Sequence, residues 1–232
     1  MNVISFAAVT KSYGKIEVLK GIDFTVRQGF FVVIVGPSGC GKSTLLRIIA
    51  GLEKETTGMV SVSDNPSMVF QNSTLLPWRD VSGNIMLGVE SKRDVSDSNK
   101  NLLVEQSIEL MGLTQYTSHF PRELSGGQRQ RVGIARAIVG DPSIILFDEP
   151  FSALDAETTE NLHREILDIW SKKQLTIIMV SHSLDEAIEL ADIIYVMKDG
   201  VIVHKECIGM DRPRNNKDVH TESIKAKLKS FF

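Results

Sequence analysis

The sequence predicts an α/β fold with a mostly parallel sheet, an N-terminal antiparallel β portion and an inserted helical subdomain. Alternating apolar residues fill the first third of the chain, and polar helical segments follow Asn72. From Ser125 onward, short apolar strands alternate with helical segments. Because strands that alternate with helices favour a parallel sheet covered on both faces, the second half predicts most of that sheet.

The elements follow from the periodicity of the apolar residues. FTVRQGFFVVIVGP predicts strands that end at Gly36, and STLLRIIAGL then has helical periodicity. GMVSVS and SMVFQ predict a short pair of strands, and SKRDVSDSNKNLLVEQSIELMGL is the clearest helix of the polar stretch. Further on we expect strands at SIILF, LTIIMVS and DIIYVM, and helices over 157–171 and 184–190. Asp199 and Gly200 predict a hairpin turn.

Composition narrows the classes of function. The 232 residues carry a formal charge of −3, which gives no overall basic surface, so we expect no nucleic-acid partner. The longest apolar run, FFVVIVG, is far below the roughly 18–20 residues that cross a bilayer, so a membrane role requires a partner. The N-terminus does not have the pattern of a signal peptide. Cys40 and Cys207 lack metal spacing, which favours a reducing compartment, and we expect both to be buried or half-buried.

Residues 36–44, GPSGCGKST, form a strong signal for a P-loop, since they lie between a predicted strand and a predicted helix. Glycines let backbone N–H groups curl around phosphate oxygens without an intervening side chain. Lys42 would reach the β and γ phosphates of ATP, Ser43 would offer its hydroxyl to Mg²⁺, and Thr44 would hold the α and β phosphates. The other loop residues expected at the nucleotide are Gly36, Pro37, Ser38, Gly39, Cys40 and Gly41. The sequence therefore predicts a P-loop NTPase core.

Two acids end the apolar strand in SIILFDEP, at residues 143–150. Asp148 can hold the Mg²⁺ shell, and Glu149 can polarise a water molecule for attack on the γ-phosphate. Acids at a strand end also serve as helix caps or turn residues. The P-loop upstream favours the metal and water roles over that alternative.

A second glycine-rich turn, LSGGQ at 124–128, precedes Asp148 and runs into a predicted helix. Together with the P-loop it makes the chain resemble the ATP-binding-cassette family over essentially its whole length. The resemblance implies that two cassettes dimerise head to tail on ATP. Each turn, made of Leu124, Ser125, Gly126, Gly127 and Gln128, would cap the nucleotide held by the partner's P-loop. A helix N-terminus suits this role because it offers N–H donors and a positive dipole end.

The resemblance also implies roles for four single residues. Tyr13, in KSYG, would stack on adenine; alternatively it is an edge-strand aromatic. Gln71, in VFQ, would contact Mg²⁺ and the attacking water and couple the site to a membrane partner. His182, in VSH, would contact the γ-phosphate and, with Glu149, Gln71 and Lys42, complete the catalytic set. Asp155, in SALD, would lie at the dimer interface; alternatively it caps the following helix.

The chain is expected to form a single cassette domain over residues 1–232. Its core would cover about 1–71 and 131–206, and its helical subdomain about 72–130. Residues 207–232 would be a C-terminal tail that contains a solvated helix. Relatives usually place a longer β segment between the positions of Gly58 and Gln71, so we expect part of the antiparallel portion to be trimmed.

Among cassettes, a stand-alone bacterial transporter subunit is favoured. No membrane span is fused to the cassette, and Lys42 lies too close to Ser125 for the long coiled coil of the DNA-repair relatives. FQNSTLLPWRDVSGNIMLG, at 70–88, is similar to import ATPases for nitrate, sulfonate and taurine. In that group a periplasmic or extracellular solute-binding protein delivers the solute to separate transmembrane permease subunits, and the ATPase lies on the cytoplasmic side of the cell membrane.

The same resemblance implies a permease contact. Leu76, Pro77 and Trp78 would lie near the groove that receives the permease; alternatively, Trp78 is a core residue under the helical subdomain. Two other functions remain open. One is a non-transport switch that acts through ATP-driven dimerisation, and the other is an exporter or lipoprotein-release ATPase.

Overall fold

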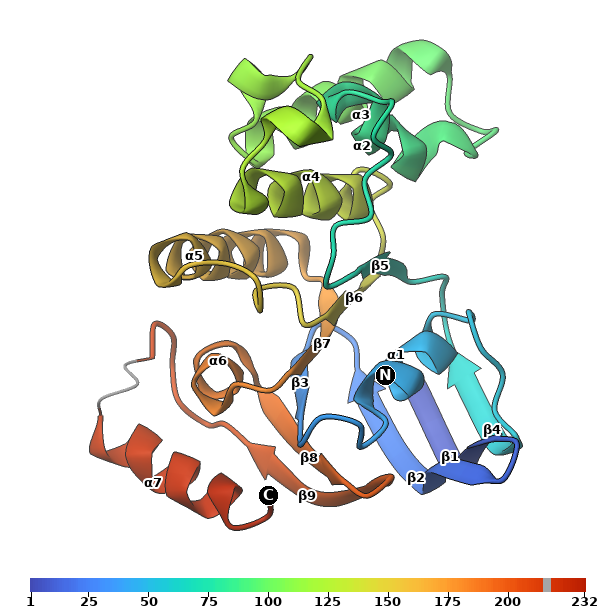
Figure 1. Cartoon of the computed structure of the whole chain (residues 1–232), viewed down its shortest axis with the longest axis vertical. Coiled ribbons are helices and arrows are strands. Elements are labelled where there is room, and N and C mark those ends of the chain that lie inside the picture. The colour runs from blue at the N-terminus through green and yellow to red at the C-terminus, as the bar shows by residue number, and fades with distance from the viewer. Residues whose placement is uncertain (215–217) are drawn as a thin grey trace.

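Two β-sheets occupy the lower part of the molecule in the view of Figure 1, a computed structural model that describes residues 1–214 and 218–232. The antiparallel sheet has the order β2-β1-β4, and the larger sheet has the order β5-β6-β7-β3-β8-β9. In the larger sheet the β8–β9 pair is antiparallel and the other pairs are parallel, which confirms the prediction. The strands are β1 (Asn2–Tyr13), β2 (Ile16–Arg27), β3 (Phe31–Val35), β4 (Thr57–Val62), β5 (Ser67–Val69), β6 (Ile144–Asp148), β7 (Thr176–Ser181), β8 (Ile193–Lys198) and β9 (Val201–Cys207).

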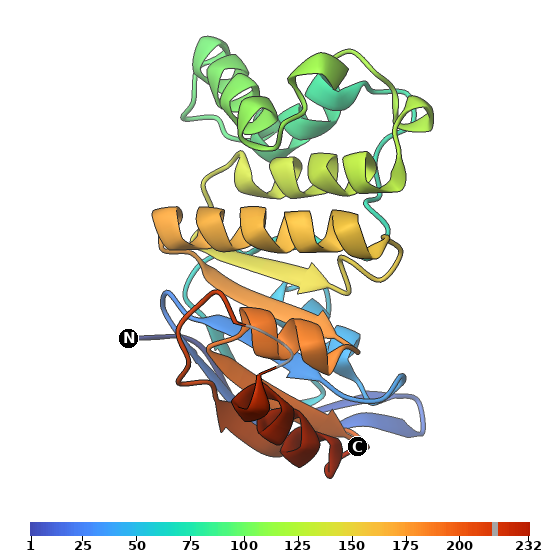
Figure 2. The same ribbon diagram turned by 90° about the vertical axis from the view of Figure 1, so that its left-hand side faces the viewer.

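Side chains alternate across the parallel strands and so divide the core in two. Val33, Phe147 and Met179 face one cluster, which includes residues of α4 (Gly126–Ile138), α5 (Ala156–Lys173) and α6 (Leu184–Leu190). Their neighbours in sequence face the other cluster, with α1 (Lys42–Ile49) and the antiparallel sheet. Figure 2 shows α5 lying along the sheet beneath α4. Because both faces are covered, the central strands are continuous apolar runs.

The predicted pairing of GMVSVS with SMVFQ is wrong. β4 pairs with β1 in the antiparallel sheet, whereas β5 pairs with β6 in the parallel sheet. Asp64, in the turn between them, accepts a hydrogen bond from Ser143 Oγ at 2.7 Å. Since Ser143 directly precedes β6, this bond holds the turn between β4 and β5 beside the start of β6.

The helices inserted between β5 and β6 form a lobe above α5 (Figure 1). They are α2 (Val81–Glu90), α3 (Asp97–Leu110) and α4, with 3₁₀ turns at Thr114–Tyr116 and Pro121–Glu123. α2 and α4 cross at Gly88, where an added Cβ would lie 2.2 Å from Arg136 O. The division into core and helical subdomain stays a prediction, and its boundary at residue 130 falls inside α4.

The C-terminal part begins after the β8–β9 hairpin, whose turn residues Asp199 and Gly200 both have positive φ, as that turn requires. Part of the predicted tail, residues 215–217, lies outside the described residues. The predicted helix forms as α7 (Val219–Lys229), but it packs on the domain, because Leu228 is buried and Lys225 pairs with Asp185 at 2.5 Å. Throughout residues 1–214 and 218–232, no helix is long and apolar enough to span a membrane.

Candidate functional site

The loop GPSGCGKST joins the end of β3 to the start of α1. Lys42 is buried, and its Nζ donates hydrogen bonds to Gly36 O at 2.8 Å and Pro37 O at 3.0 Å. Gly41 has a φ of 104°, and an added Cβ there would lie 2.8 Å from Leu19 Cδ2, so only glycine fits. The loop therefore curls around an ammonium group, which is a suitable arrangement for holding phosphate oxygens.

Asp148 lies at the end of β6, beside the first turn of α1. Ser43 Oγ donates to Asp148 Oδ1 at 2.8 Å. β3 and β6 belong to one parallel sheet with β7 between them, so their carboxyl ends meet at the same edge. Mg²⁺ prefers hydroxyl and carboxylate oxygens together with phosphate oxygens, so this pair of side chains fits a Mg²⁺ site.

Glu149 and His182 directly follow the ends of β6 and β7. His182 Nδ1 lies 3.3 Å from Glu149 Oε2. Glu149 has a φ of 46°, which is unusual for a residue with a side chain, and its N–H donates to Val180 O at 3.1 Å. The chain thus holds a carboxylate and an imidazole together next to Asp148, where they can orient a water molecule.

Gln71 is linked to the backbone of Glu149 through Ser152. Its Nε2 donates to Ser152 Oγ at 3.1 Å, and Ser152 Oγ donates to Glu149 O at 3.0 Å. No role was expected for Ser152 from the sequence. Its place in SALD, three residues after Glu149, could have indicated a contact at the site. The structure therefore brings Gln71, Glu149 and His182 into one cluster.

Tyr13 ends β1 and lies next to α1. Its hydroxyl donates to Glu53, and this bond raises the pKa of Tyr13 and lowers that of Glu53, while Thr44 has an opposing effect on the pKa of Tyr13. Tyr13 as a whole is 45% exposed. Lys11 Nζ lies 4.9 Å from the ring centroid.

The turn at 124–128 forms the N-terminus of α4. Ser125 Oγ accepts from Gln128 N at 3.2 Å, and Gln128 Oε1 accepts from Ser125 N at 2.8 Å. These reciprocal bonds form a capping box, which leaves the N–H groups of the exposed Gly126 and the half-buried Gly127 pointing beyond the helix end. Leu124 is buried beneath the turn. In Figures 1 and 2, α4 lies above α5, whereas the P-loop lies below α5. The turn therefore does not reach the P-loop of its own chain.

Asp155 caps the N-terminus of α5. Its carboxylate accepts from Thr158 N at 2.9 Å and from Thr158 Oγ1 at 2.7 Å. These bonds lower the pKa of Asp155. The capping alternative is confirmed, and the interface role stays a prediction.

Three further predictions concern burial. Cys40 is buried, and burial raises the pKa of its thiol, whereas Cys207 is exposed, so the expectation for Cys207 was wrong. Cys207 ends β9, where alternate side chains face solvent. The core alternative for Trp78 is also wrong, because this side chain is 70% exposed.

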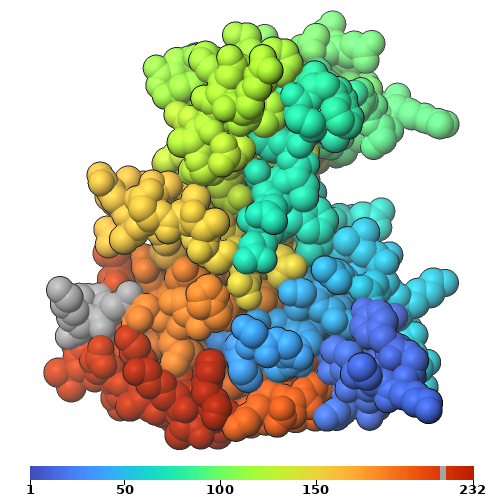
Figure 3. Space-filling model, in the orientation of Figure 1, coloured from blue at the N-terminus to red at the C-terminus, as the bar shows by residue number. Residues whose placement is uncertain are grey.

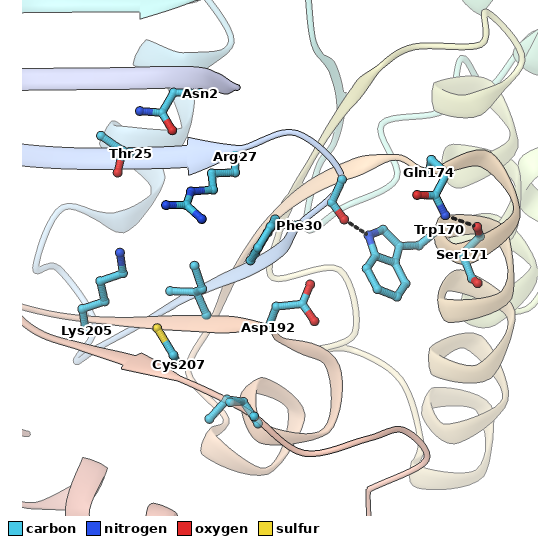
Figure 4. Close-up of a pocket in the computed structure, with 14 residues that line it drawn as sticks. Asn2, Thr25, Arg27, Phe30, Trp170, Ser171, Gln174, Asp192, Lys205 and Cys207 are labelled. Atoms are coloured by element: carbon cyan, nitrogen blue, oxygen red, sulfur yellow. Dashed lines mark hydrogen bonds between the residues drawn. The ribbon is translucent and has the colours of Figure 1, made fainter.

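A separate cavity of about 750 Å³ lies at the opposite ends of the parallel strands, where β3 and β8 begin (Figure 4). At its rim, Trp170 Nε1 donates to Gly29 O at 3.1 Å, and Asp192 Oδ2 accepts from Phe31 N at 2.8 Å. Its lining contains none of the predicted nucleotide or catalytic residues. This cavity is therefore distinct from the candidate nucleotide site.

Comparison with known proteins identifies the class that this fold and site define. Residues 19–152 match the family model for the ABC transporter, and the chain belongs to that family. It is an ATP-binding cassette and an ATPase, as the resemblance in its motifs implied.

Particular relatives cover nearly the whole chain. It is 38% identical to the aliphatic sulfonates import ATP-binding protein SsuB 1 of Streptomyces avermitilis, over 98% of this chain and 85% of that protein. Identity to the nitrate import ATP-binding protein NrtD of Synechococcus elongatus is also 38%, over 98% of this chain and 89% of that protein. Among solved structures, the dimeric, post-hydrolysis state of the ATP-binding cassette MJ0796 bound to ADP and Pi matches with a TM-score of 0.78 and 31% identity, over 90% of this chain and 100% of that one.

Proposed function

We propose that this chain is the ATPase subunit of a bacterial importer. A homodimer that closes on ATP would drive separate transmembrane permease subunits from the cytoplasmic side of the membrane. One observation carries the proposal: the P-loop, Asp148, Glu149, His182 and Gln71 gather at the carboxyl ends of the parallel strands and form a half-site, while the turn at 124–128 lies outside it. A second copy of the chain would complete the site.

Each residue of the half-site would have its own role in binding or hydrolysing ATP. Lys42 and the loop N–H groups would hold the β and γ phosphates, Thr44 would hold the α and β phosphates, and Tyr13 would stack on adenine. Glu149 would accept a proton from the attacking water, and His182 would keep that carboxylate aimed, as their 3.3 Å separation supports. Gln71 would place the water from the other side.

Mg²⁺ would be held by Ser43 and Asp148, with Gln71 nearby. The 2.8 Å contact between the hydroxyl and the carboxylate supports this assignment, because both oxygens already share one small volume. The ion would supply positive charge against the β and γ phosphates. Ser43 would turn a lone pair of its hydroxyl to the metal, beside the carboxylate oxygens of Asp148.

The partner subunit would supply its Ser125 turn as a lid on the γ-phosphate, and Asp155 would lie at the interface. The dimeric state of MJ0796, 31% identical to this chain, supports such an assembly. The N–H groups of the exposed Gly126 and the half-buried Gly127 at the start of α4 suit an incoming anion.

The membrane partner would contact the segment around Leu76, Pro77 and Trp78. A side chain of this size that is 70% exposed is typical of an interface anchor. The relatives named for sulfonate and nitrate import support a small anion or organic solute, such as nitrate, a sulfonate or taurine, delivered by a solute-binding protein. Residues 1–71, 72–130, 131–206 and 207–232 would act together as one cassette domain.

Size-exclusion chromatography of Glu149→Gln tests the dimer. We expect Mg-ATP to convert this variant from monomer to dimer, because ATP bound without turnover keeps the interface closed. Ser125→Arg in the same chain should abolish the dimer, since an arginine would occupy the space of the phosphate.

Ser63→Arg is the matched control, since Ser63 is also exposed but lies in the turn after β4. It should dimerise normally. A dimer that survives Ser125→Arg would rule out the lid role of this turn. A monomer in every variant, despite measured ATP binding, would rule out ATP-driven closure of the isolated chain.

A further inference from the structure

The cavity of about 750 Å³ lies on the side of the molecule away from the P-loop. In Figure 2 the parallel strands run from left to right, and the face shown in Figure 3 is the right-hand side of that view, where the P-loop lies. The cavity is at the left-hand ends of these strands, so a ligand there would not meet ATP. Its volume is typical of sites that bind small molecules.

The cavity arises because the two sheets meet at one end and separate at the other. β2 is an edge strand of the antiparallel sheet, and β9 is an edge strand of the larger sheet. Near the β8–β9 turn they are joined by a bond from Lys20 N to Gly200 O at 2.9 Å. Further along β2, Tyr195 Oη donates to Thr25 O at 3.0 Å. Past Thr25 the cavity begins, and both edge strands contribute to its lining.

One wall of the cavity is held by hydrogen bonds of its own. Trp170 Nε1 donates to Gly29 O at 3.1 Å, and Arg212 Cζ lies 4.5 Å from the Trp170 ring centroid. Asp192 accepts from Phe31 N at 2.8 Å and pairs with Arg212 at 2.8 Å. Among the described residues, Asp192 is the one acid in the lining, and Arg212 balances its charge. This wall is therefore already ordered and close to neutral.

The opposite wall carries two positive charges without an acidic partner. Arg27 extends from β2 and Lys205 from β9, and in Figure 4 their charged ends point into the gap between the strands. Across residues 1–214 and 218–232, the only polar interaction of either side chain is a weak contact of Lys205 Nζ with the Tyr195 ring, whose centroid is 5.4 Å away. Two cations in a concave site produce a positive potential that attracts anions.

The two ends of the cavity differ in chemistry. Figure 4 shows the two cations at one end and Trp170 at the other, with Phe30 between them. The guanidinium fork of an arginine pairs with a carboxylate through two parallel hydrogen bonds. Aromatic side chains favour packing against another aromatic ring. A carboxylate attached to an aromatic ring therefore matches both ends.

We propose that this cavity binds a small aromatic carboxylate. Arg27 and Lys205 hold the carboxylate group, and the ring packs against Phe30 and Trp170. The ligand also joins β2 to β9, so it stabilises the junction of the two sheets. The site is independent of the proposed function, because none of the predicted nucleotide or catalytic residues lines it.

Trp170 itself can report binding. The chain has two tryptophans, so Trp78→Phe leaves Trp170 as the only source of indole fluorescence. We expect 4-nitrobenzoate to quench this fluorescence saturably, because a nitroaromatic ring quenches an indole that it contacts. Isothermal titration calorimetry should show much weaker binding of 4-nitrobenzamide, the neutral analogue of the same shape, and of acetate, the anion without a ring.

Variants of the two cations test their contribution. Arg27→Gln and Lys205→Gln should each raise the Kd of 4-nitrobenzoate by about tenfold, the usual loss of one charge-assisted hydrogen bond. Lys20→Gln is the matched control and should keep the native Kd, because Lys20 is an exposed cation of β2 that does not line the cavity. Lys42→Ala should also keep it, since only a carboxylate bound in the P-loop would be lost in that variant.

Three results would overturn the proposal. They are absence of saturable binding of 4-nitrobenzoate, equal affinity for 4-nitrobenzamide, and an unchanged Kd in both Arg27→Gln and Lys205→Gln. Loss of binding in Lys42→Ala would also overturn it, because the carboxylate would then occupy the P-loop. Mg-ATP binding should be native in Arg27→Gln and Lys205→Gln, which shows that both variants fold and separates this proposal from the proposed function.

Discussion

Glu149 combines a strained backbone with a constrained carboxylate. Its positive φ turns the chain sharply after β6, and its N–H is fixed to β7 by Val180 O. The turn brings the side chain to His182 rather than into the core. Strain of this kind persists where surrounding contacts determine the geometry, and here it aims one carboxylate.

For this residue we expect Glu149→Gln to lower the kcat of ATP hydrolysis by ~10²–10⁴-fold, since an amide cannot accept the proton from water. ATP affinity should stay near that of the native chain, because the P-loop is unchanged. Phosphate release and equilibrium nucleotide binding measure the two quantities.

Glu157→Gln is the matched control, an exposed glutamate in the first turn of α5, and should keep the native kcat. If Glu149→Gln hydrolyses ATP at a rate near that of the native chain, a group other than Glu149 activates the water.

For single residues, motif spacing predicted most of the candidate site. Lys42, Ser43 and Asp148 could be recognised because each belongs to a local pattern of strand, loop and helix. Ser152 could not be assigned a role, because it acts through a hydrogen bond to Gln71, which lies 81 residues away in sequence.

Among the elements, the crossing of α2 and α4 depends on a glycine. An added Cβ at Gly88 would lie 2.2 Å from Arg136 O and 2.5 Å from Val139 Cγ1. The first of these is a backbone atom of α4, the helix that begins at the turn at 124–128, so it cannot move alone. The helical lobe therefore has little space for a larger side chain at Gly88.

We expect Gly88→Ala to reduce the free energy of unfolding by roughly 1–3 kcal/mol, the usual cost of overpacking. Urea unfolding measures the change. Gly209→Ala is the matched control, because no atom lies within 4 Å of its added Cβ and its φ is not positive. Equal stability of the two variants would contradict the close crossing.

The elements themselves were largely predictable. The helices over 157–171 and 184–190 and the strand at DIIYVM lie where their periodicity indicated. The sheets that β4 and β5 join were not predictable, because a short apolar strand can join either sheet. The strands that they pair with, β1 and β6, are set by contacts outside the segment itself.

For the whole molecule, the half-site arrangement predicts stabilisation by ligand. Mg-ATP at about 100 times its Kd should add ~2.7 kcal/mol to the free energy of unfolding if it binds only the folded chain. A rise in Tm in differential scanning fluorimetry, absent with Mg²⁺ alone, would report it.

Lys42→Ala should lose this shift, because the buried ammonium group inside the loop is removed. Lys229→Ala, in the last turn of α7, should keep it. A shift that survives Lys42→Ala would indicate that nucleotide binds elsewhere in the molecule.

The sequence by itself determined the family, the P-loop and the acids that follow β6, because each is a short pattern whose chemistry depends on neighbouring residues. Only the tertiary structure decided that β4 and β5 lie in different sheets, that Trp78 faces solvent, and that Arg27 and Lys205 line one cavity. These features depend on contacts between segments distant in sequence, and periodicity within a segment carries no information about its partner.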